Sequence, residues 1–214
     1  MRYRIVPVTK FRQNCALLWC PDTRAGAVTD PGPEVDKILA AIAEEGVSVE
    51  KILVTHGHAD HSGGAAELSE RLGVPIEGPH RADDFLIEAM PKQAQRTGLA
   101  ARIFAPDRWL EEGETVSFGN ITLSVIHCPG HTPGHVVFHH PASKLAVVGD
   151  VLFRGSMGRC DGPRGDHMAL VNAIRCKLWP LGNDTEFIPG HGEMSTFAWE
   201  RASNAMICDF VDYD

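Results

Sequence analysis

The sequence lacks a long apolar segment, a block of like charges and a paired-cysteine motif. No run of 18 apolar residues occurs among its 214 residues, which excludes a transmembrane helix. The net charge is −8, which argues against binding the phosphate backbone of nucleic acids as the main activity. The residues after Met1 lack the apolar stretch of a signal peptide. We therefore expect a cytoplasmic protein with neither nucleic-acid nor membrane partners.

Cysteine is present without the spacing of a disulfide or zinc framework. The six cysteines form no CxxC pair, and a cytosolic chain keeps its thiols reduced. We interpret them as buried or incidental thiols: Cys15, Cys20, Cys128, Cys160, Cys176 and Cys208. With 43% hydrophobic residues the chain can bury a sizeable core, and we expect a single domain over residues 1–214.

Side chains that bind metals are concentrated in the segment Thr-His-Gly-His-Ala-Asp-His at 55–61, directly after the apolar run 52–54. His56 and His58 are two positions apart, so on an extended segment they point the same way. The aspartate and the last histidine fall where a helix begins, so a turn could aim the two pairs at two neighbouring metals. Imidazole and carboxylate suit zinc, iron and manganese.

Three further ligand-type residues follow apolar segments elsewhere in the chain. His131 lies in Cys-Pro-Gly-His-Thr-Pro-Gly-His, Asp150 closes the apolar run 145–149, and His191 lies in Pro-Gly-His-Gly. Loops at one edge of a sheet commonly supply site residues in α/β proteins. We therefore expect these side chains to complete the metal site.

These segments, in this order, resemble the metallo-β-lactamase fold, and within it the glyoxalase II-like hydroxyacylglutathione hydrolases. The resemblance runs from about residue 3 to residue 200 and includes the Asp30-Pro31-Gly32 turn and Gly149–Phe153 followed by Gly158-Arg159. It implies an α/β protein, an αββα sandwich. Only 23 residues follow His191, so the chain resembles the short bacterial form that lacks the C-terminal helical region.

The resemblance also implies a role for each ligand-type residue. The first of two divalent ions would be bound by His56, His58 and His131, and the second by Asp60, His61 and His191. Asp150 would bridge the two ions together with a water or hydroxide, which Asp60, as the catalytic residue, would orient. We expect zinc, with iron or manganese as alternatives. His135 and Asp30 are expected to orient the ligands from behind.

The reaction implied is hydrolysis of a small-molecule thioester linked to glutathione, most plausibly S-lactoylglutathione, by the metal-bridging hydroxide. The loop 153–165 follows Asp150 and holds three arginines in an acidic protein. A guanidinium is well matched to a substrate carboxylate. Arg159 matches a basic position of the family's loop, and we expect it and Arg154 to contact the substrate.

Other proteins of this fold remain alternatives. A glutathione persulfide dioxygenase would hold a single iron through His56, His131 and Asp150. β-Lactamases usually lack the bridging carboxylate, and flavodiiron proteins carry Glu at the position of His58. Lactonases often use a tyrosine near the site, but only Tyr3 and Tyr213 occur here. A metal-dependent binding or sensor protein is the non-enzymatic alternative.

Periodicity and turn residues predict alternating strands and helices. We expect strands near 3–9, 15–19, 25–29, 50–54, 115–118, 121–127, 135–139, 144–149 and 185–188, and helices near 34–45, 62–72, 166–178 and 195–203. Gly119-Asn120 is the expected hairpin turn, and Asp166 is a candidate N-cap. We place His139 and His140 on a strand that faces solvent.

Overall fold

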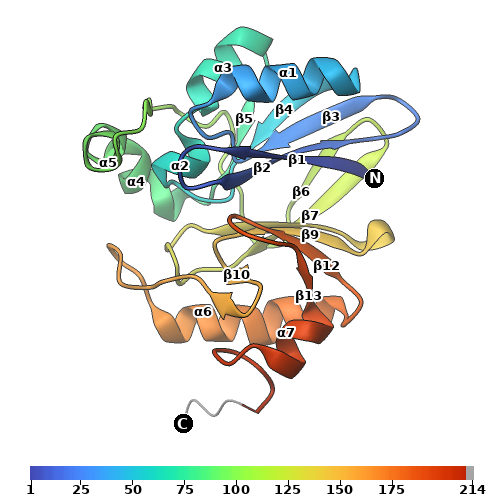
Figure 1. Ribbon diagram of the computed structural model, residues 1–214, viewed down its shortest axis with the longest axis vertical. Coiled ribbons are helices and arrows are strands. Elements are labelled where there is room, and N and C mark those ends of the chain that lie inside the picture. Colours follow the sequence, from blue (N-terminus) through green and yellow to red (C-terminus); the bar gives the residue numbers. More distant parts are fainter. Residues whose placement is uncertain (211–214) are drawn as a thin grey trace.

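Two mixed β-sheets pack face to face between layers of helices in the computed structural model, which describes residues 1–210 (Figure 1). The first sheet consists of Arg2–Val8 (β1), Gln13–Trp19 (β2), Ala25–Thr29 (β3), Ser48–Leu53 (β4) and Ile76–Glu77 (β5), in that order. The second has the order β13-β12-β9-β8-β7-β6. Its strands are Thr115–Phe118 (β6), Ile121–His127 (β7), Val136–His140 (β8), Leu145–Gly149 (β9), Glu186–Pro189 (β12) and Ser195–Thr196 (β13).

Helices cover the outer face of each sheet, as Figure 1 shows. The first sheet is covered by Val35–Glu45 (α1) and Ala65–Leu72 (α3). The second is covered by His167–Ala173 (α6), which continues as a π-helical turn over Ile174–Leu178, and by Phe197–Ser203 (α7). The αββα sandwich expected from the sequence is therefore confirmed.

Shorter elements gather near the edge where the predicted ligands lie. They are the helices Ala59–Ser62 (α2), Asp84–Glu88 (α4) and Met90–Thr97 (α5), the 3-10 turn Arg81–Asp83, and the hairpin of Leu152–Phe153 (β10) with Ser156–Met157 (β11). Two more 3-10 turns span Pro141–Ser143 and Trp179–Leu181. No helix within residues 1–210 is long and apolar enough to cross a membrane.

The buried apolar side chains form three layers that match the sandwich. One cluster lies between the two sheets and includes Leu18 and Phe138. A second, which includes Ile38, lies beneath α1 and α3, and a third, which includes Phe187 and Phe197, lies beneath α6 and α7. Each large apolar side chain buried here contributes roughly 1.5–3 kcal/mol of transfer free energy. This burial holds the sheet edge and its loops in place.

Two local features that the sequence predicts, a helix N-cap and a hairpin turn, are present in the structure. The side chain of Asp166 accepts a hydrogen bond from the backbone N–H of Ala169 at 2.9 Å and so caps α6. The hairpin turns at Gly119, whose φ of 50° lies in the left-handed region that glycine adopts without strain. The N-cap and hairpin predictions are confirmed.

The prediction that His139 and His140 face solvent is wrong. Their exposed fractions are 6% and 9%, and every residue of β8 is buried. This strand lies inside the second sheet, between β7 and β9, with the other sheet on one face and helices on the other. Polar side chains in a central strand can be buried, which alternation along the sequence does not reveal. Burial lowers the pKa of both histidines.

Candidate metal centre

The residues predicted as metal ligands lie together at one edge of the two sheets. Because β9 and β12 are parallel, their carboxyl ends meet at this edge and carry Asp150 and His191. The segment 55–61 leaves β4 of the first sheet and enters α2, and His131 lies in the loop between β7 and β8. Both sheets therefore contribute to the site.

Three imidazoles form the first cluster of ligand atoms. His58 Nδ1 lies 3.0 Å from His56 Nε2 and 3.0 Å from His131 Nε2. Ligand nitrogens of a tetrahedral zinc ion lie roughly 3.3 Å apart, so the spacing suits one ion. Burial lowers the pKa of His56 well below its usual range and that of His58 to about 3. Both imidazoles are neutral at physiological pH, which is the form that binds a metal.

A carboxylate and two imidazoles form the second cluster. His191 Nε2 lies 3.2 Å from His61 Nε2 and 3.3 Å from Asp60 Oδ2. Burial opposes protonation of His61, but the carboxylates of Asp150 and Asp60 raise its pKa well above the usual value. This part of the site therefore favours positive charge.

Asp150 lies between the two clusters. Its Oδ1 is 3.2 Å from His61 Nε2, and its Oδ2 is 3.5 Å from His131 Nε2. Burial by itself would raise the pKa of Asp150, but His61 and His131 hold it well below its usual range. A Cβ at Gly190 would lie 2.1 Å from Asp150 Oδ1, so only glycine leaves room for this carboxylate. One ionised side chain can thus serve both clusters.

The outer nitrogens of three imidazoles face acceptors, which fixes their tautomers. The acceptors are Asp30 Oδ2 at 3.0 Å for His61 Nδ1, the carbonyl of Phe11 at 3.1 Å for His191 Nδ1 and the carbonyl of Arg159 at 2.7 Å for His131 Nδ1. The inner nitrogens lie close to one another, with 3.2 Å between His61 Nε2 and His191 Nε2 and 3.0 Å between His131 Nε2 and His58 Nδ1, as the ligands of one shared cation do. The two groups of ligand atoms fit divalent cations.

Asp30 and His135 contact the predicted ligands from behind. Besides His61, Asp30 accepts hydrogen bonds from the backbone N–H and the hydroxyl of Thr55, both at 2.7 Å. His135 Nε2 accepts the backbone N–H of Asp150 at 3.0 Å, and its ring stacks on His56 with 4.7 Å between centroids. Asp30 thus holds His61, and His135 holds Asp150 and His56.

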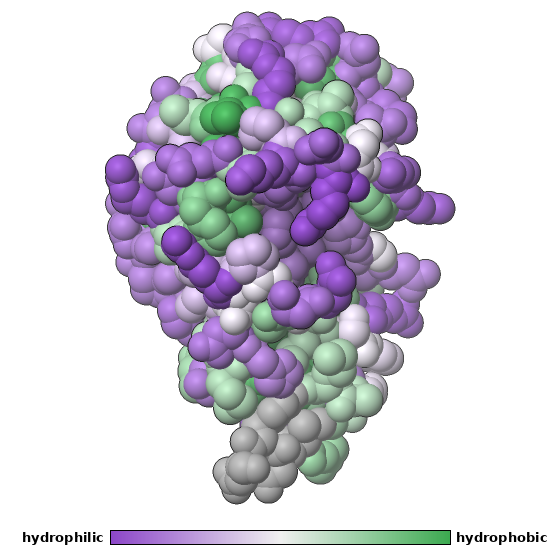
Figure 2. All heavy atoms as spheres, turned by 90° about the vertical axis from the view of Figure 1, so that its left-hand side faces the viewer, coloured by the Kyte–Doolittle hydropathy of each residue, from purple (hydrophilic) through white to green (hydrophobic). Residues whose placement is uncertain are grey.

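A cavity of about 480 Å³ opens above the two clusters. Apart from predicted ligands its lining consists of Phe11, Gln93, Arg96, Thr97, Phe153 and Arg159. The side chain of Arg159 is 85% exposed, and its guanidinium lies 3.9 Å from the carboxylate of Asp161. Figure 2 shows this side of the molecule, where mostly hydrophilic side chains border the hollow. A polar substrate would therefore find a charged entrance above the ligand atoms.

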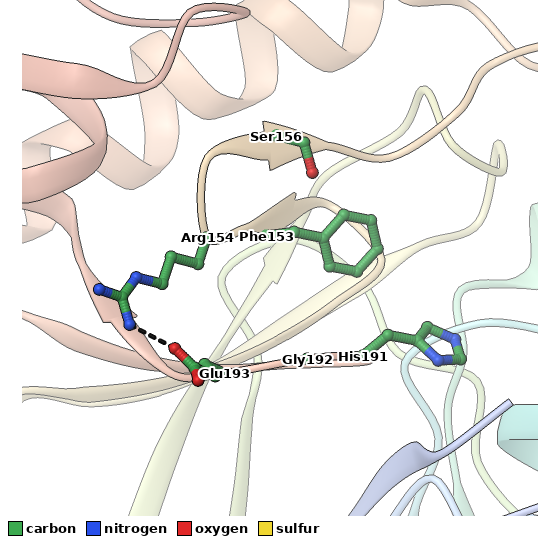
Figure 3. Close-up of a pocket in the computed structure, with 6 residues that line it drawn as sticks. All are labelled: Phe153, Arg154, Ser156, His191, Gly192 and Glu193. Carbon is green, nitrogen blue, oxygen red and sulfur yellow. Dashed lines mark hydrogen bonds and ion pairs between the residues drawn. The ribbon is translucent and has the colours of Figure 1, made fainter.

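Arg154, the other arginine predicted to contact substrate, lines a neighbouring cavity of about 340 Å³. Figure 3 shows its side chain turned away from Phe153 and His191 and paired with Glu193. Its guanidinium lies 5.5 Å from the ring centroid of Trp199. The two cavities share Phe153 and His191 in their linings.

The α5 residues of this lining were missed in the sequence analysis. Gln93, Arg96 and Thr97 are spaced at i, i+3 and i+4, so they share one face of the helix. Gln93 accepts the backbone N–H of Ala59 at 3.1 Å and donates to the carbonyl of Gly57 at 3.0 Å. The sequence shows the helical spacing of these residues, but the segment contains no motif of metal-ligand residues that would assign it to a site.

Comparison with known proteins gives consistent matches over nearly the whole chain. A family model described as the Metallo-beta-lactamase superfamily matches residues 8–191. The protein named hydroxyacylglutathione hydrolase GloC from Haemophilus influenzae is 44% identical over 209 residues, which cover 97% of this chain and 98% of that protein. Two solved structures are also similar. TTHA1623 in a di-iron-bound form has a TM-score of 0.87 and 36% identity over 95% of this chain and 100% of its own. The BLEG-1 B3 metallo-beta-lactamase has a TM-score of 0.89 and 28% identity over 96% and 99%.

Proposed function

Because the chain belongs to the metallo-beta-lactamase superfamily, we propose that it is a metal-dependent hydrolase that cleaves S-lactoylglutathione to lactate and glutathione. The observation that carries this proposal is the placement of Asp150 between two complete clusters of ligand atoms. The name of the Haemophilus influenzae relative supports the thioester substrate. A glutathione-linked substrate, which carries carboxylates, also suits a cavity whose lining includes Arg96 and Arg159.

The chain binds two divalent ions through the clusters described above. His56, His58 and His131 would hold the first ion, Asp60, His61 and His191 would hold the second, and Asp150 lies where its carboxylate could serve both. Zinc is the metal we propose, with iron and manganese as alternatives, because nitrogen and carboxylate ligands accept all of them. The di-iron form of TTHA1623 keeps iron open as the native metal.

When bound, the two ions supply a water of lowered pKa as nucleophile and positive charge for the carbonyl oxygen of the thioester. The chain's own residues orient these parts. Asp60 borders the cavity with an ionised carboxylate, which can accept a hydrogen bond from the attacking water and direct its lone pair to the carbonyl. A thiolate is a weakly basic leaving group, so the reaction needs little help from a general acid.

Arginines at the cavity hold the carboxylates of the glutathione part. Arg159 can turn toward substrate because its guanidinium is exposed and its contact with Asp161, at 3.9 Å, is long. Arg96 approaches from the opposite element, α5. Arg154 would have to exchange Glu193 for a substrate carboxylate, and an exposed ion pair of this kind contributes roughly 0–1 kcal/mol. The exchange would therefore cost little.

We further propose a cytoplasmic setting and a single domain over residues 1–214. All six cysteines are free thiols, as expected in a reducing compartment. The three apolar clusters adjoin across shared sheets, which supports one cooperative unit.

The test is steady-state turnover of S-lactoylglutathione by protein of known metal content, run beside oxygen uptake with glutathione persulfide. Thioester cleavage with close to two metal ions per chain and no oxygen uptake is the expected result. Oxygen uptake with one iron per chain would instead establish the dioxygenase alternative, in which His61 and His191 are not ligands. A β-lactam serves as a third substrate, because one solved relative is named a metallo-beta-lactamase.

A further inference from the structure

A buried carboxylate, that of Asp83, lies between the two loops that carry the three-histidine cluster. Asp83 ends the 3-10 turn Arg81–Asp83 and is fully buried. Within the part of the chain that the structure describes, it is neither among the residues that line the cavity above the metal centre nor among the groups of ligand atoms.

The hydrogen bonds of this carboxylate join the two loops. Asp83 Oδ2 accepts the backbone N–H of Gly57 at 3.0 Å and the hydroxyl of Thr132 at 2.8 Å. Asp83 Oδ1 accepts the backbone N–H of Gly134 at 2.6 Å. Gly57 lies between His56 and His58 in the chain, and Thr132 directly follows His131. One side chain therefore fixes the spacing of all three imidazoles.

The packing around Asp83 leaves the loops no room to shift. A Cβ at Gly134 would lie 2.5 Å from the backbone nitrogen of Asp83 and 2.7 Å from its Cγ. The backbone N–H of His80 donates to the carbonyl of Gly134 at 3.0 Å, which adds a second tie to the same loop. A displacement of Asp83 would therefore move Gly134 and, with it, the loop of His131.

Placing a carboxylate here is costly for folding. Burial raises the pKa of Asp83, and the three hydrogen-bond donors oppose this by favouring the ionised form. Apolar residues could hold two loops together without burying a charge. An anion in a low-dielectric interior also attracts a cation bound nearby, and groups that hold metal ligands commonly change metal affinity 10–100-fold. Asp30, behind the second cluster, likewise accepts a backbone N–H, that of Thr55, and in addition contacts the imidazole of His61 directly.

We propose that Asp83 is a positioning residue for the three-histidine cluster, which it holds in the geometry that binds a divalent ion without coordinating the ion itself. This inference rests on the ligand assignment proposed above. It predicts that loss of Asp83 weakens one of the two metal sites selectively.

The experiment is a zinc titration of metal-free protein, with competition by a chromophoric chelator to resolve two dissociation constants. His58→Ala and His191→Ala serve as references that identify the constant belonging to each cluster. Asp83→Ala is expected to weaken the three-histidine site tenfold or more and to leave the other within about threefold. The matched control is Asp107→Ala, which removes another aspartate that accepts a backbone N–H, that of Ile76 at 2.8 Å, outside the metal centre.

A second, milder variant keeps the test informative if Asp83→Ala fails to fold. Thr132→Val removes one of the donors to Asp83 and keeps the β-branched shape, so we expect a smaller weakening of the same site, restored in Thr132→Ser. Equal weakening of both sites, or constants unchanged in both Asp83→Ala and Thr132→Val, would overturn the inference. Wild-type protein that binds none of zinc, iron and manganese would overturn the ligand assignment itself, which separates the two failures.

Discussion

The carboxylate of Asp30 lies 3.0 Å from His61 Nδ1, on the side of the imidazole opposite the metal centre. Both side chains are fully buried, and the φ of Asp30 is 49°, in the left-handed region. The Asp-Pro-Gly turn that follows β3 therefore determines which nitrogen of His61 faces the ligand cluster.

Replacing Asp30 with Asn should weaken the second cluster. Asn can keep an oxygen for the backbone N–H of Thr55, but it places an N–H₂ group at the position of Oδ2, toward which His61 Nδ1 and the Thr55 hydroxyl point. His61 therefore loses the acceptor that fixes its tautomer. We expect kcat/KM to fall about 10–100-fold with a parallel loss of bound metal. Quantification of zinc after dialysis, beside the kinetics, checks this. Full metal content with unchanged kinetics would contradict it.

Asp60→Ala and His58→Ala should each reduce turnover of S-lactoylglutathione by roughly three orders of magnitude or more. Each variant removes a side chain from one cluster, and Asp60 also orients the attacking water in the proposed reaction. Lys37→Ala on the exposed face of α1 is the control, with expected rates within twofold of wild type. A protein that only binds or senses metal would show reduced affinity in these variants and no turnover to lose.

Arg159→Ala should raise KM for the glutathione thioester about 10–100-fold and change kcat little. The guanidinium offers a charge-assisted hydrogen bond to a substrate carboxylate, whose loss costs roughly 1.5–3 kcal/mol. Measurement with a small thioester that lacks carboxylates provides the control, because its KM should be the same in both proteins. If KM rises equally for both substrates, Arg159 does not recognise a carboxylate.

Asp166→Ala should lower the free energy of unfolding by about 1 kcal/mol. The substitution removes the acceptor for the backbone N–H of Ala169 at the start of α6. Urea denaturation of matched samples measures the change, and Asp166→Ser, which also caps helices, should recover most of it. Identical midpoints for Asp166→Ala and wild type would show that the cap contributes nothing.

Stability should decline as the pH falls below about 6.5, the pKa of histidine in an unfolded chain. Burial lowers the pKa of His127, so the unfolded chain binds the proton more readily than the folded one does. The free energy of unfolding is therefore highest above about pH 6.5, where the imidazole is neutral in both states, and it decreases as the pH falls below about 6.5. His127→Gln keeps a donor for the carbonyl of Pro133, which His127 Nε2 contacts at 2.8 Å. Its unfolding free energy, at fixed metal concentration, should fall less than that of wild type between pH 7.5 and 5.5.

Much of the fold was readable because strand and helix ends carry strong local signals. The hairpin at Gly119 and the cap at Asp166 depend on neighbours in sequence, and both were predicted correctly. The burial of His139 and His140 depends instead on which strand becomes central in a sheet. The place of a strand in its sheet depends on pairing with segments far away in the sequence. The local pattern of polar residues therefore predicted exposed side chains where the structure has buried ones.

Some residues of the candidate site could likewise be predicted from the sequence, and others could not. The ligand-type residues stand beside glycine and proline at strand ends, where their side-chain chemistry is recognisable. Asp83 and Gln93 lie in no recognisable motif, because each acts through hydrogen bonds to the backbone of a loop that is distant in sequence. Residues of this kind become visible only once the loops are placed beside one another.

Each cluster of ligand atoms draws on both halves of the sandwich. The loop after β4 of the first sheet supplies His58 and His61, whereas His131 and His191 come from loops of the second sheet. Ions bound at such a place act as cross-links between the two halves, and any opening of the sheets must first release them. If the chain binds metal as proposed, the midpoint of thermal unfolding rises with the free metal concentration, so metal supply sets the stability of the fold as well as the activity.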